Sequence, residues 1–446
     1  MSFKHKKSKE HNKQVIQKTC SLRLYPNQEQ ERLFADYFGV SRYVYNKGLK
    51  LKKEAYAKDK TNLGYGDLAK LLTKWRETVP WIGKVYCHVE QASLKHLDEA
   101  FRNFFRRLKS KTKEKGFPRF KKKHGKQSFE FPARVRVKEG KVKLPKIGEV
   151  RFLNYNGYLD DKTLGKTTIV KSPTGKYYAQ VLVKTEKKIP EKLPVSFKNT
   201  VGIDLGLLNY IVSSNGLKIP NPKFFKILDA KKKRLSRWLS RTQKGSRNRV
   251  KARLRLARCY EQIKNKVNNF LHSTVNQLVR DNQTNRFVLE TLNIKGMQKN
   301  RHLAGSIQQA SWAAFQHMLE YKARWCGKTV VYADPFFPSS KRCVDCGSIN
   351  KNLQIKDREW VCPSCGVWHD RDVNASMELR LWPEISLAEN RAGAARIAER
   401  ENAHANASGE GVLVQSAAMP LSKALVERGN PDGAPPNRLP ELVSEG

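Results

Sequence analysis

The sequence predicts a multidomain protein of mixed α/β and β-sheet architecture, and three observations support this fold class. The chain has 446 residues, about three times the roughly 150 residues of an average domain. Apolar residues recur at helical spacing through residues 27–110, and short strand-like runs with turn signals replace them over residues 127–185. Four of the eight cysteines fall between Cys343 and Cys365, which indicates a small metal-stabilised module.

The net charge indicates the kind of partner. Lys and Arg total 87 and Asp and Glu total 41, so the formal net charge is +46. A magnitude of roughly 2–8 suffices for the solubility of a small domain, and a larger excess opposes compaction unless a polyanion neutralises it. Residues 381–446 hold 6 basic and 9 acidic residues, so the excess lies entirely in residues 1–380. The composition therefore argues against an enzyme of small metabolites and predicts a nucleic-acid partner.

The first half is expected to contain helices and then a β region. Residues 27–110 predict helices, and residues 111–126 a basic loop. Residues 127–185 predict an antiparallel sheet or small barrel, and residues 186–198 a linker. Residues 1–14 have no apolar segment, so we expect a disordered basic arm there and not a secretory signal. No run approaches the roughly 18 apolar residues of a membrane span.

The second half is expected to be an α/β unit. A strand at 200–206 and its hairpin partner at 209–216, which ends in an Asn-Gly turn, come first. A long helical stretch dense in Lys and Arg follows at residues 228–281. After it we expect a strand at 286–290, a helix at 308–326 and a second strand at 328–333. Residues 381–446 are rich in Ala, Gly, Asn and Pro without periodicity and are expected to be mostly disordered.

The cysteines form two C-x2-C pairs at zinc-binding spacing. Cys343 and Cys346 make the first pair, and Cys362 and Cys365, 15 residues later, make the second. Two such knuckles complete a tetrahedral four-thiolate site, in which no coordination position stays open, so the zinc is expected to be structural. A thioredoxin-type redox pair is the alternative, but it needs only one C-x2-C. A glycine follows each pair, where the turn is expected to need a positive φ.

Three acidic residues lie in a predicted strand, at the end of another, and at the start of a predicted helix, where they could bind metal ions. Asp204 lies in an apolar strand, Glu290 ends a short apolar strand, and Asp372 enters a helix directly after the cysteines. Each has an ordinary explanation: Asp204 as a turn cap, Glu290 as a surface strand end and Asp372 as a helix N-cap. Together they suit a pair of Mg2+ ions, which prefer carboxylate oxygens and, roughly 3.5–4 Å apart, catalyse phosphodiester hydrolysis.

Short strings along residues 18–380 occur in an order and spacing typical of one family. They lie at residues 41–46, 116–121, 144–148, 202–206, 245–249, 290–294, 321–323, 334–335 and 370–375, together with both cysteine pairs. On these strings the chain resembles the TnpB (OrfB) family of transposon-encoded, RNA-guided nucleases, which are related to type V CRISPR effectors. Ser339 and Ser340 replace the Thr-Ser that the family often has before its first knuckle, and residues 381–446 match the family poorly.

The resemblance implies a domain division. Residues 1–26 and 115–195 would form a wedge β-barrel domain, into which a helical recognition domain at 27–114 is inserted. A RuvC-like nuclease of the RNase H fold would occupy residues 196–340 and 368–380. A zinc ribbon at 341–367, a target nucleic-acid-binding insertion, would interrupt it, and residues 381–446 would be a disordered tail.

The resemblance also implies site residues. Carried over by position, Asp204, Glu290 and Asp372 match the three catalytic, Mg2+-binding acids of the family's nuclease, with Asp370 as the less favoured alternative to Asp372. The four cysteines of the two pairs match the zinc ligands. The implied cofactors are therefore two Mg2+ ions and one structural Zn2+.

The implied activity is RNA-guided cutting of DNA. The protein would bind a transposon-derived guide RNA, recognise a short motif beside the target, and hydrolyse double-stranded DNA as a Mg2+-dependent endodeoxyribonuclease. A monomer is favoured, in the prokaryotic cytoplasm and associated with the nucleoid, with no membrane partner. Three alternatives stay open: a DNA-joining transposase, a nuclease-inactive RNA-guided or zinc-ribbon DNA-binding regulator, and a miniature CRISPR effector.

Overall fold

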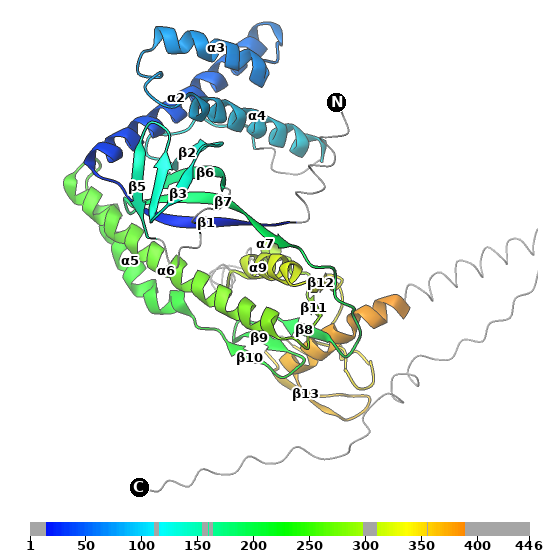
Figure 1. Ribbon diagram of the computed structural model, residues 1–446. Coiled ribbons are helices and arrows are strands. Elements are labelled where there is room, and N and C mark those ends of the chain that lie inside the picture. Colours follow the sequence, from blue (N-terminus) through cyan, green and yellow to red (C-terminus); the bar gives the residue numbers. More distant parts are fainter. Residues whose placement is uncertain are drawn as a thin grey trace, which may run out of the picture. The chain divides into compact units, whose positions relative to one another are not determined.

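The chain folds into two compact units. The computed structural model describes residues 15–110, 116–153, 159, 164–297, 310–354 and 356–388 (Figure 1). One unit comprises Met1–Pro190 with Lys226–Lys266, and the other Glu191–Phe225 with Val267–Gly446. Within the described ranges, no helix has the length and apolar character needed to cross a membrane. The expected basic arm at 1–14 lies outside the described residues.

Three helices form the expected helical segment of the first unit. They are α2 (Gln28–Asp59), α3 (Tyr65–Thr78) and α4 (Cys87–Lys109). Asn27 starts α2 with a capping box, in which its side chain accepts the backbone N–H of Gln30 at 2.8 Å and its own N–H donates to the Gln30 side chain at 3.1 Å. The sequence-based prediction of helices over 27–110 is confirmed.

The β region of the first unit is an open sheet. Its seven strands have the order β2-β6-β7-β1-β5-β4-β3, in which every pairing is antiparallel. The strands are β1 (Val15–Tyr25), β2 (Gln127–Phe131), β3 (Arg136–Lys138), β4 (Lys141–Leu144), β5 (Gly148–Phe152), β6 (Leu164–Lys171) and β7 (Tyr177–Lys188). Among the described residues the edge strands β2 and β3 do not pair, so the expected closed barrel is not found. β3 has only three residues, which is too short to close a sheet through its free edge.

Helices and sheet of the first unit share one hydrophobic core. Phe34 and Tyr37 of α2 pack against Phe129 of β2, with ring centroids 6.0 and 4.9 Å apart. Tyr37 also donates its hydroxyl proton to the carbonyl oxygen of Pro145 and accepts the backbone N–H of Tyr86, both at 3.1 Å. The helices therefore pack against β2 and hold it to the rest of the first unit.

The second unit contains a mixed five-stranded sheet of order β10-β9-β8-β11-β12. Its strands are β8 (Thr200–Asp204), β9 (Asn209–Ser213), β10 (Lys218–Pro220), β11 (Arg286–Leu289) and β12 (Thr329–Tyr332). The first three strands are antiparallel neighbours, whereas β11 runs parallel to both β8 and β12. The predicted hairpin and both later strands are confirmed. β7 extends to Lys188, so the expected linker begins later than predicted, and Leu193 in it donates its N–H to the Gly327 carbonyl at 2.8 Å.

The helices of the second half differ from the expectation in two places. The helical stretch predicted over residues 228–281 consists of two helices, α5 (Phe224–Arg241) and α6 (Arg247–Arg280), and Gly245 between them has a φ of 89°. Beyond α7 (Ile294–Met297) and α9 (Trp312–Trp325), a helix covers residues 371–388. Residues 381–388 are thus helical and not disordered, because Trp382 packs on Phe337 with ring centroids 4.9 Å apart. Residues 389–446 lie outside the described part.

Candidate functional site

Two of the three predicted acids stand at the ends of adjacent parallel strands. β8 and β11 pair with Ile203 opposite Leu289, and the next residue on each strand is Asp204 and Glu290. Parallel strands end at the same edge of a sheet, so both carboxylates lie at that edge. Residues separated widely in the sequence therefore meet because of strand register.

The helix over residues 371–388 brings the third acid to the same place. It lies directly against β8 at Gly202, where an added Cβ would stand 2.0 Å from the Ser376 carbonyl oxygen and 2.5 Å from the Arg380 nitrogen. Only a residue without a side chain permits this approach. Gly202 therefore permits the close helix–strand contact that places Asp372 near Asp204.

The structure separates the roles of the two acids in residues 370–372. Asp370 Oδ1 accepts the backbone N–H groups of Asp372 at 2.9 Å and Val373 at 3.1 Å, so Asp370 is the N-cap of the helix. Its other oxygen, Oδ2, pairs with Lys218 Nζ at 2.9 Å. Burial raises the pKa of Asp370, but the Lys218 hydrogen bond and the two N–H groups outweigh it and lower the pKa. Asp372 is therefore not the N-cap, and it contacts Arg358 Nη1 at 3.4 Å.

The three acids, here called the acid cluster (Asp204, Glu290 and Asp372), repel one another. Burial, followed by the charges of Glu290 and Asp372, raises the pKa of Asp204 well above its usual value, and Arg371 opposes this rise. The side-chain oxygens of the cluster do not all lie within 4.8 Å of one another, a criterion that the cysteines meet. Carboxylate oxygens are the donors that Mg2+ prefers, so the three half-buried acids fit this cation by their chemical type.

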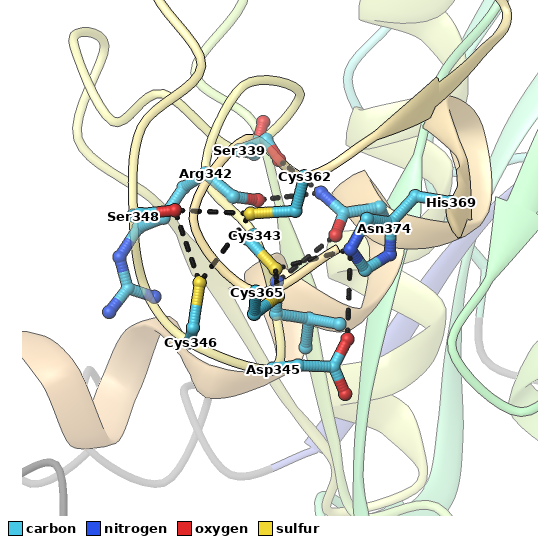
Figure 2. Close-up of polar contacts among 11 residues, drawn as sticks. Ser339, Arg342, Cys343, Asp345, Cys346, Ser348, Cys362, Cys365, His369 and Asn374 are labelled. Carbon is cyan, nitrogen blue, oxygen red and sulfur yellow. Dashed lines mark hydrogen bonds and ion pairs between the residues drawn. The ribbon is translucent and has the colours of Figure 1, made fainter. Parts of the chain in front are cut away.

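The four cysteines, here called the cysteine cluster (Cys343, Cys346, Cys362 and Cys365), have their sulfur atoms within 4.8 Å of one another. The Cys343 and Cys365 sulfurs are 3.7 Å apart, and those of Cys346 and Cys362 are 3.6 Å apart (Figure 2). A tetrahedral zinc with Zn–S bonds of about 2.3 Å requires sulfurs about 3.8 Å apart. These separations are far too long for disulfides of about 2.05 Å. The donor set and its spacing fit a four-thiolate zinc site.

Backbone turns shape both knuckles alike. The N–H of Gly347 donates to the Cys343 carbonyl at 2.8 Å, and that of Gly366 donates to the Cys362 carbonyl at 2.9 Å. Both glycines have a positive φ, 74° and 73°, as the sequence predicts. The second knuckle sits on a two-stranded antiparallel sheet of β13 (Glu359–Val361) and β14 (Trp368–Asp370). β14 leads directly into the helix over residues 371–388, so the cysteine cluster and Asp372 share one rigid element.

Two buried residues that the sequence reasoning missed link the clusters. Ser339 donates its hydroxyl proton to Glu290 Oε1 at 2.6 Å. Asn374 Nδ2 donates to the carbonyls of Ser339, at 3.3 Å, and Arg342, at 2.7 Å, while its Oδ1 accepts the N–H of Val344 at 3.1 Å (Figure 2). Both side chains are 2% exposed. Asn374 belongs to the family-typical string at 370–375, but the sequence does not show which groups it binds by hydrogen bonds.

A buried ion pair fastens the first knuckle to the same helix. Arg342 Nη1 contacts Glu378 Oε2 at 2.6 Å, and Glu378 is fully buried. The pKa of Glu378 is raised to about 7, because burial, with a small contribution from Asp345, outweighs the opposing effect of Arg342. His369 lies beside the cysteine cluster, with Nε2 3.1 Å from Cys343 Sγ and 3.7 Å from Asp345 Oδ2. Neither Glu378 nor His369 was singled out in the sequence.

Comparison with protein families gives three matches along the chain. The family described as "Probable transposase" matches residues 180–301, and the "Cas12f1-like, TNB domain" matches residues 312–379. A "Helix-turn-helix domain" matches residues 16–61. In this structure that segment forms β1 and the single helix α2, without the turn between two helices that its name describes.

Comparison with whole proteins gives relatives over most of the chain. A protein of Streptomyces pristinaespiralis, named as an RNA-guided DNA endonuclease, is 33% identical over 371 residues, which cover 82% of this chain and 89% of that one. InsQ of Escherichia coli (strain K12), also named as an RNA-guided DNA endonuclease, is 27% identical over 80% of this chain and 90% of its own. A solved Cas12f1 chain in complex with sgRNA and target DNA covers 82% of this chain and 99% of its own, at 15% identity and a TM-score of 0.45. Because the S. pristinaespiralis relative is 33% identical and the match covers most of both chains, this protein belongs to the TnpB (OrfB) family.

Proposed function

We propose that the protein is an RNA-guided DNA endonuclease whose hydrolytic site is the acid cluster. The observation that carries this proposal is the convergence of three carboxylates, from two strands and one helix, at one edge of the second unit's sheet. Their mutual repulsion costs folding free energy, so a structural role does not explain them. The names of the relatives indicate the class of reaction, and the acid cluster indicates which residues would catalyse it.

The acid cluster is proposed to hold two Mg2+ ions. When bound, they supply an activated water and stabilise the leaving oxygen of the phosphodiester. Ser339 fixes the orientation of Glu290 by its hydrogen bond, and the helix over residues 371–388 fixes Asp372 against β8. A cation bound beside Asp204 would oppose the burial and the neighbouring negative charges that raise the pKa of its carboxyl group.

The finer fold assignments belong to the same proposal. The mixed five-stranded sheet, with acids on the carboxyl ends of two parallel strands, supports a RuvC-like nuclease of the RNase H fold at 196–340 and 368–380. The sulfur spacing supports a zinc ribbon at 341–367 that holds one structural Zn2+. The wedge and helical recognition domains at 1–26, 115–195 and 27–114 are proposed with the open sheet of the first unit in place of a barrel.

The proposed partners are a guide RNA and double-stranded target DNA with an adjacent motif. The excess of positive charge supports two polyanions, because each strand contributes its own row of phosphates. A monomer in the bacterial cytoplasm is the proposed working state. A nuclease-inactive regulator is disfavoured because all three acids are present and converge, and strand-transfer products from purified protein would instead favour the transposase.

The test is to purify the protein with its co-expressed flanking DNA, sequence the RNA that accompanies it, and challenge a plasmid library with randomised sequence beside a guide-matched target. Mg2+-dependent, guide-dependent cutting is expected. Asp204→Ala should abolish cutting and leave RNA binding intact. Absence of bound RNA, or cutting by the Asp204→Ala protein, would refute the proposal. Lys218→Ala, near but outside the cluster, serves as the matched control and should still cut.

A further inference from the structure

A groove in the first unit has no role in the hydrolytic site. It is a hollow of about 830 Å³ along one face of α2, and its far wall comes from Trp81, Lys84 and Phe120. Its volume is within the roughly 300–1,000 Å³ of typical ligand pockets. We call it the α2 groove.

Two of the short sequence strings typical of the family, at residues 41–46 and 116–121, lie together at this groove. Asn46, in the string at 41–46, donates its Nδ2 proton to the Lys121 carbonyl at 2.9 Å and accepts the Lys121 N–H on Oδ1 at 2.8 Å. This paired hydrogen bond fixes the string at 116–121 against α2. It explains why an asparagine is suited to position 46, since its amide offers a donor and an acceptor to the backbone C=O and N–H of one residue.

Aromatic rings that the core does not bury line the α2 groove. Trp81 is 42% exposed and Phe120 is 48% exposed. The Tyr43 ring meets Trp81 edge to face, at a centroid distance of 4.8 Å. Lys47 Nζ lies 5.6 Å from the Tyr43 centroid, and Lys53 Nζ lies 5.2 Å from that of Phe120. Exposed aromatic faces beside cations are the features on which nucleic-acid bases stack.

A second, smaller pocket of about 170 Å³ adjoins the groove, because Arg42 lines both. Its other lining cations are Lys121, Lys122 and Lys126, and none of the described residues that line it is acidic. Burial, together with the smaller effect of the Lys126 charge, lowers the pKa of Lys121 to about 8. Crowded cations without a carboxylate partner favour a bound anion, and here a phosphate group. We call this the lysine pocket.

We propose that the α2 groove and the lysine pocket together bind an unpaired nucleotide of the guide RNA, with its base on Trp81 and Phe120 and its phosphate on the lysines. This inference rests on the proposed function, which makes RNA a partner. In a guided nuclease the target strand pairs with the guide, and the displaced DNA strand is present only when a target is bound, whereas loops and bulges of a structured RNA present unpaired bases without any target. An RNA nucleotide is therefore the occupant that is available in every complex, whatever the target.

The first experiment measures RNA affinity of the full chain carrying Asp204→Ala, so that cutting plays no part. Trp81→Ala and Phe120→Ala are each expected to weaken binding of the co-purified RNA about 10-fold, the effect of losing one base stack. Tyr56→Ala removes a ring of α2 that is 58% exposed and does not line the groove, and it should bind as the parent does. For the pocket, Lys122→Glu with Lys126→Glu should weaken binding, and Lys123→Glu, between them, should weaken it less. Equal thermal midpoints exclude unfolding as the cause.

A second experiment identifies the occupant. The complex is assembled with 4-thiouridine in the RNA or with 4-thiothymidine in the target DNA, irradiated, and digested for mass spectrometry. Cross-links from RNA to the peptide that contains Trp81 or Phe120 are expected. Cross-links from DNA alone, or from neither, would overturn the inference, as would unchanged RNA affinity in the Trp81→Ala and Phe120→Ala proteins. If the parent protein binds no RNA at all, the proposed function fails instead, and the two failures are distinct.

Discussion

The acid cluster and the cysteine cluster lie in the same compact unit, and they are built in opposite ways. The cysteines come from one short segment, and their geometry follows from two tight turns closed by hydrogen bonds within each knuckle. The acids come from β8, from the end of β11 and from the helix over residues 371–388, and their geometry follows from strand register and a glycine contact. A local pattern therefore encodes the first site, and only long-range packing assembles the second.

The two clusters also differ in what they contribute to stability. Thiolates that bind zinc cross-link the chain, so the metal's binding free energy becomes folding free energy. Burial and the charges of Glu290 and Asp372 raise the pKa of Asp204, so the ionised acid cluster opposes folding until cations bind to it. We infer that the cysteine cluster is retained for structure and the acid cluster for chemistry, and the following predictions test that contrast.

The largest direct effect on cutting is expected when one of the two neighbouring acids, Asp372, is replaced by alanine. Asp372→Ala should reduce cutting by at least about 1,000-fold, equal to about 4 kcal/mol of transition-state stabilisation. Asp370→Ala should keep most of the activity and lower the free energy of unfolding by about 1 kcal/mol, because it removes a helix cap. Single-turnover cleavage and thermal unfolding of both variants measure this. The reverse pattern would assign the chemistry to Asp370.

Removal of zinc is expected to act through structure. One Zn2+ per chain should be found by metal analysis, and Cys346→Ser or a strong chelator should release it and unfold the two-stranded sheet of β13 and β14. Structural zinc in finger peptides contributes about 10–16 kcal/mol, so this segment should lose its order altogether. Asp372 follows β14 directly, and cutting should fall with it. Freshly purified protein that contains no zinc would contradict this account.

Loss of the Ser339 hydroxyl tests the link between the clusters. Ser339→Ala removes a charge-assisted hydrogen bond to Glu290 and should slow cutting about 10-fold while raising the Mg2+ concentration needed for half-maximal rate. Ser339→Thr keeps a hydroxyl and should restore both values, and Ser340→Ala is the neighbouring control. A slower rate with unchanged Mg2+ dependence would mean that Ser339 acts on folding and not on Glu290.

The smallest effect is a pH dependence of stability from Glu378. Its pKa is about 7 in the folded protein and about 4.3 in an unfolded chain, so the folded state favours the protonated form. The stabilisation is fully present below the unfolded pKa and is lost as pH rises through the folded pKa. Between pH 6 and pH 8 the wild type should lose about 1 kcal/mol that Glu378→Gln does not lose. Equal pH slopes of the unfolding midpoint in the two proteins would contradict this assignment.

Local sequence patterns were enough to predict much of the secondary structure. Helices at 27–110, the hairpin after Thr200 and the strands that became β11 and β12 follow from periodicity and turn residues. The errors arose where a single residue or a distant partner decides the outcome. Gly245 divides α5 from α6, the short β3 leaves the first sheet open, and packing of Trp382 extends the last helix.

By itself, the sequence determined the charge of the partner, the positions of most helices, the four candidate zinc donors and the three candidate catalytic acids. Those features depend on composition or on residues close along the chain. Only the tertiary structure decided that the three acids meet, that Asp370 is a cap while Asp372 is not, and that Ser339 and Asn374 join the clusters. The same holds for the α2 groove, whose walls come from strings 75 residues apart, as the separation of Asn46 and Lys121 shows. Such contacts depend on strand register and close backbone approach, which a linear pattern does not contain.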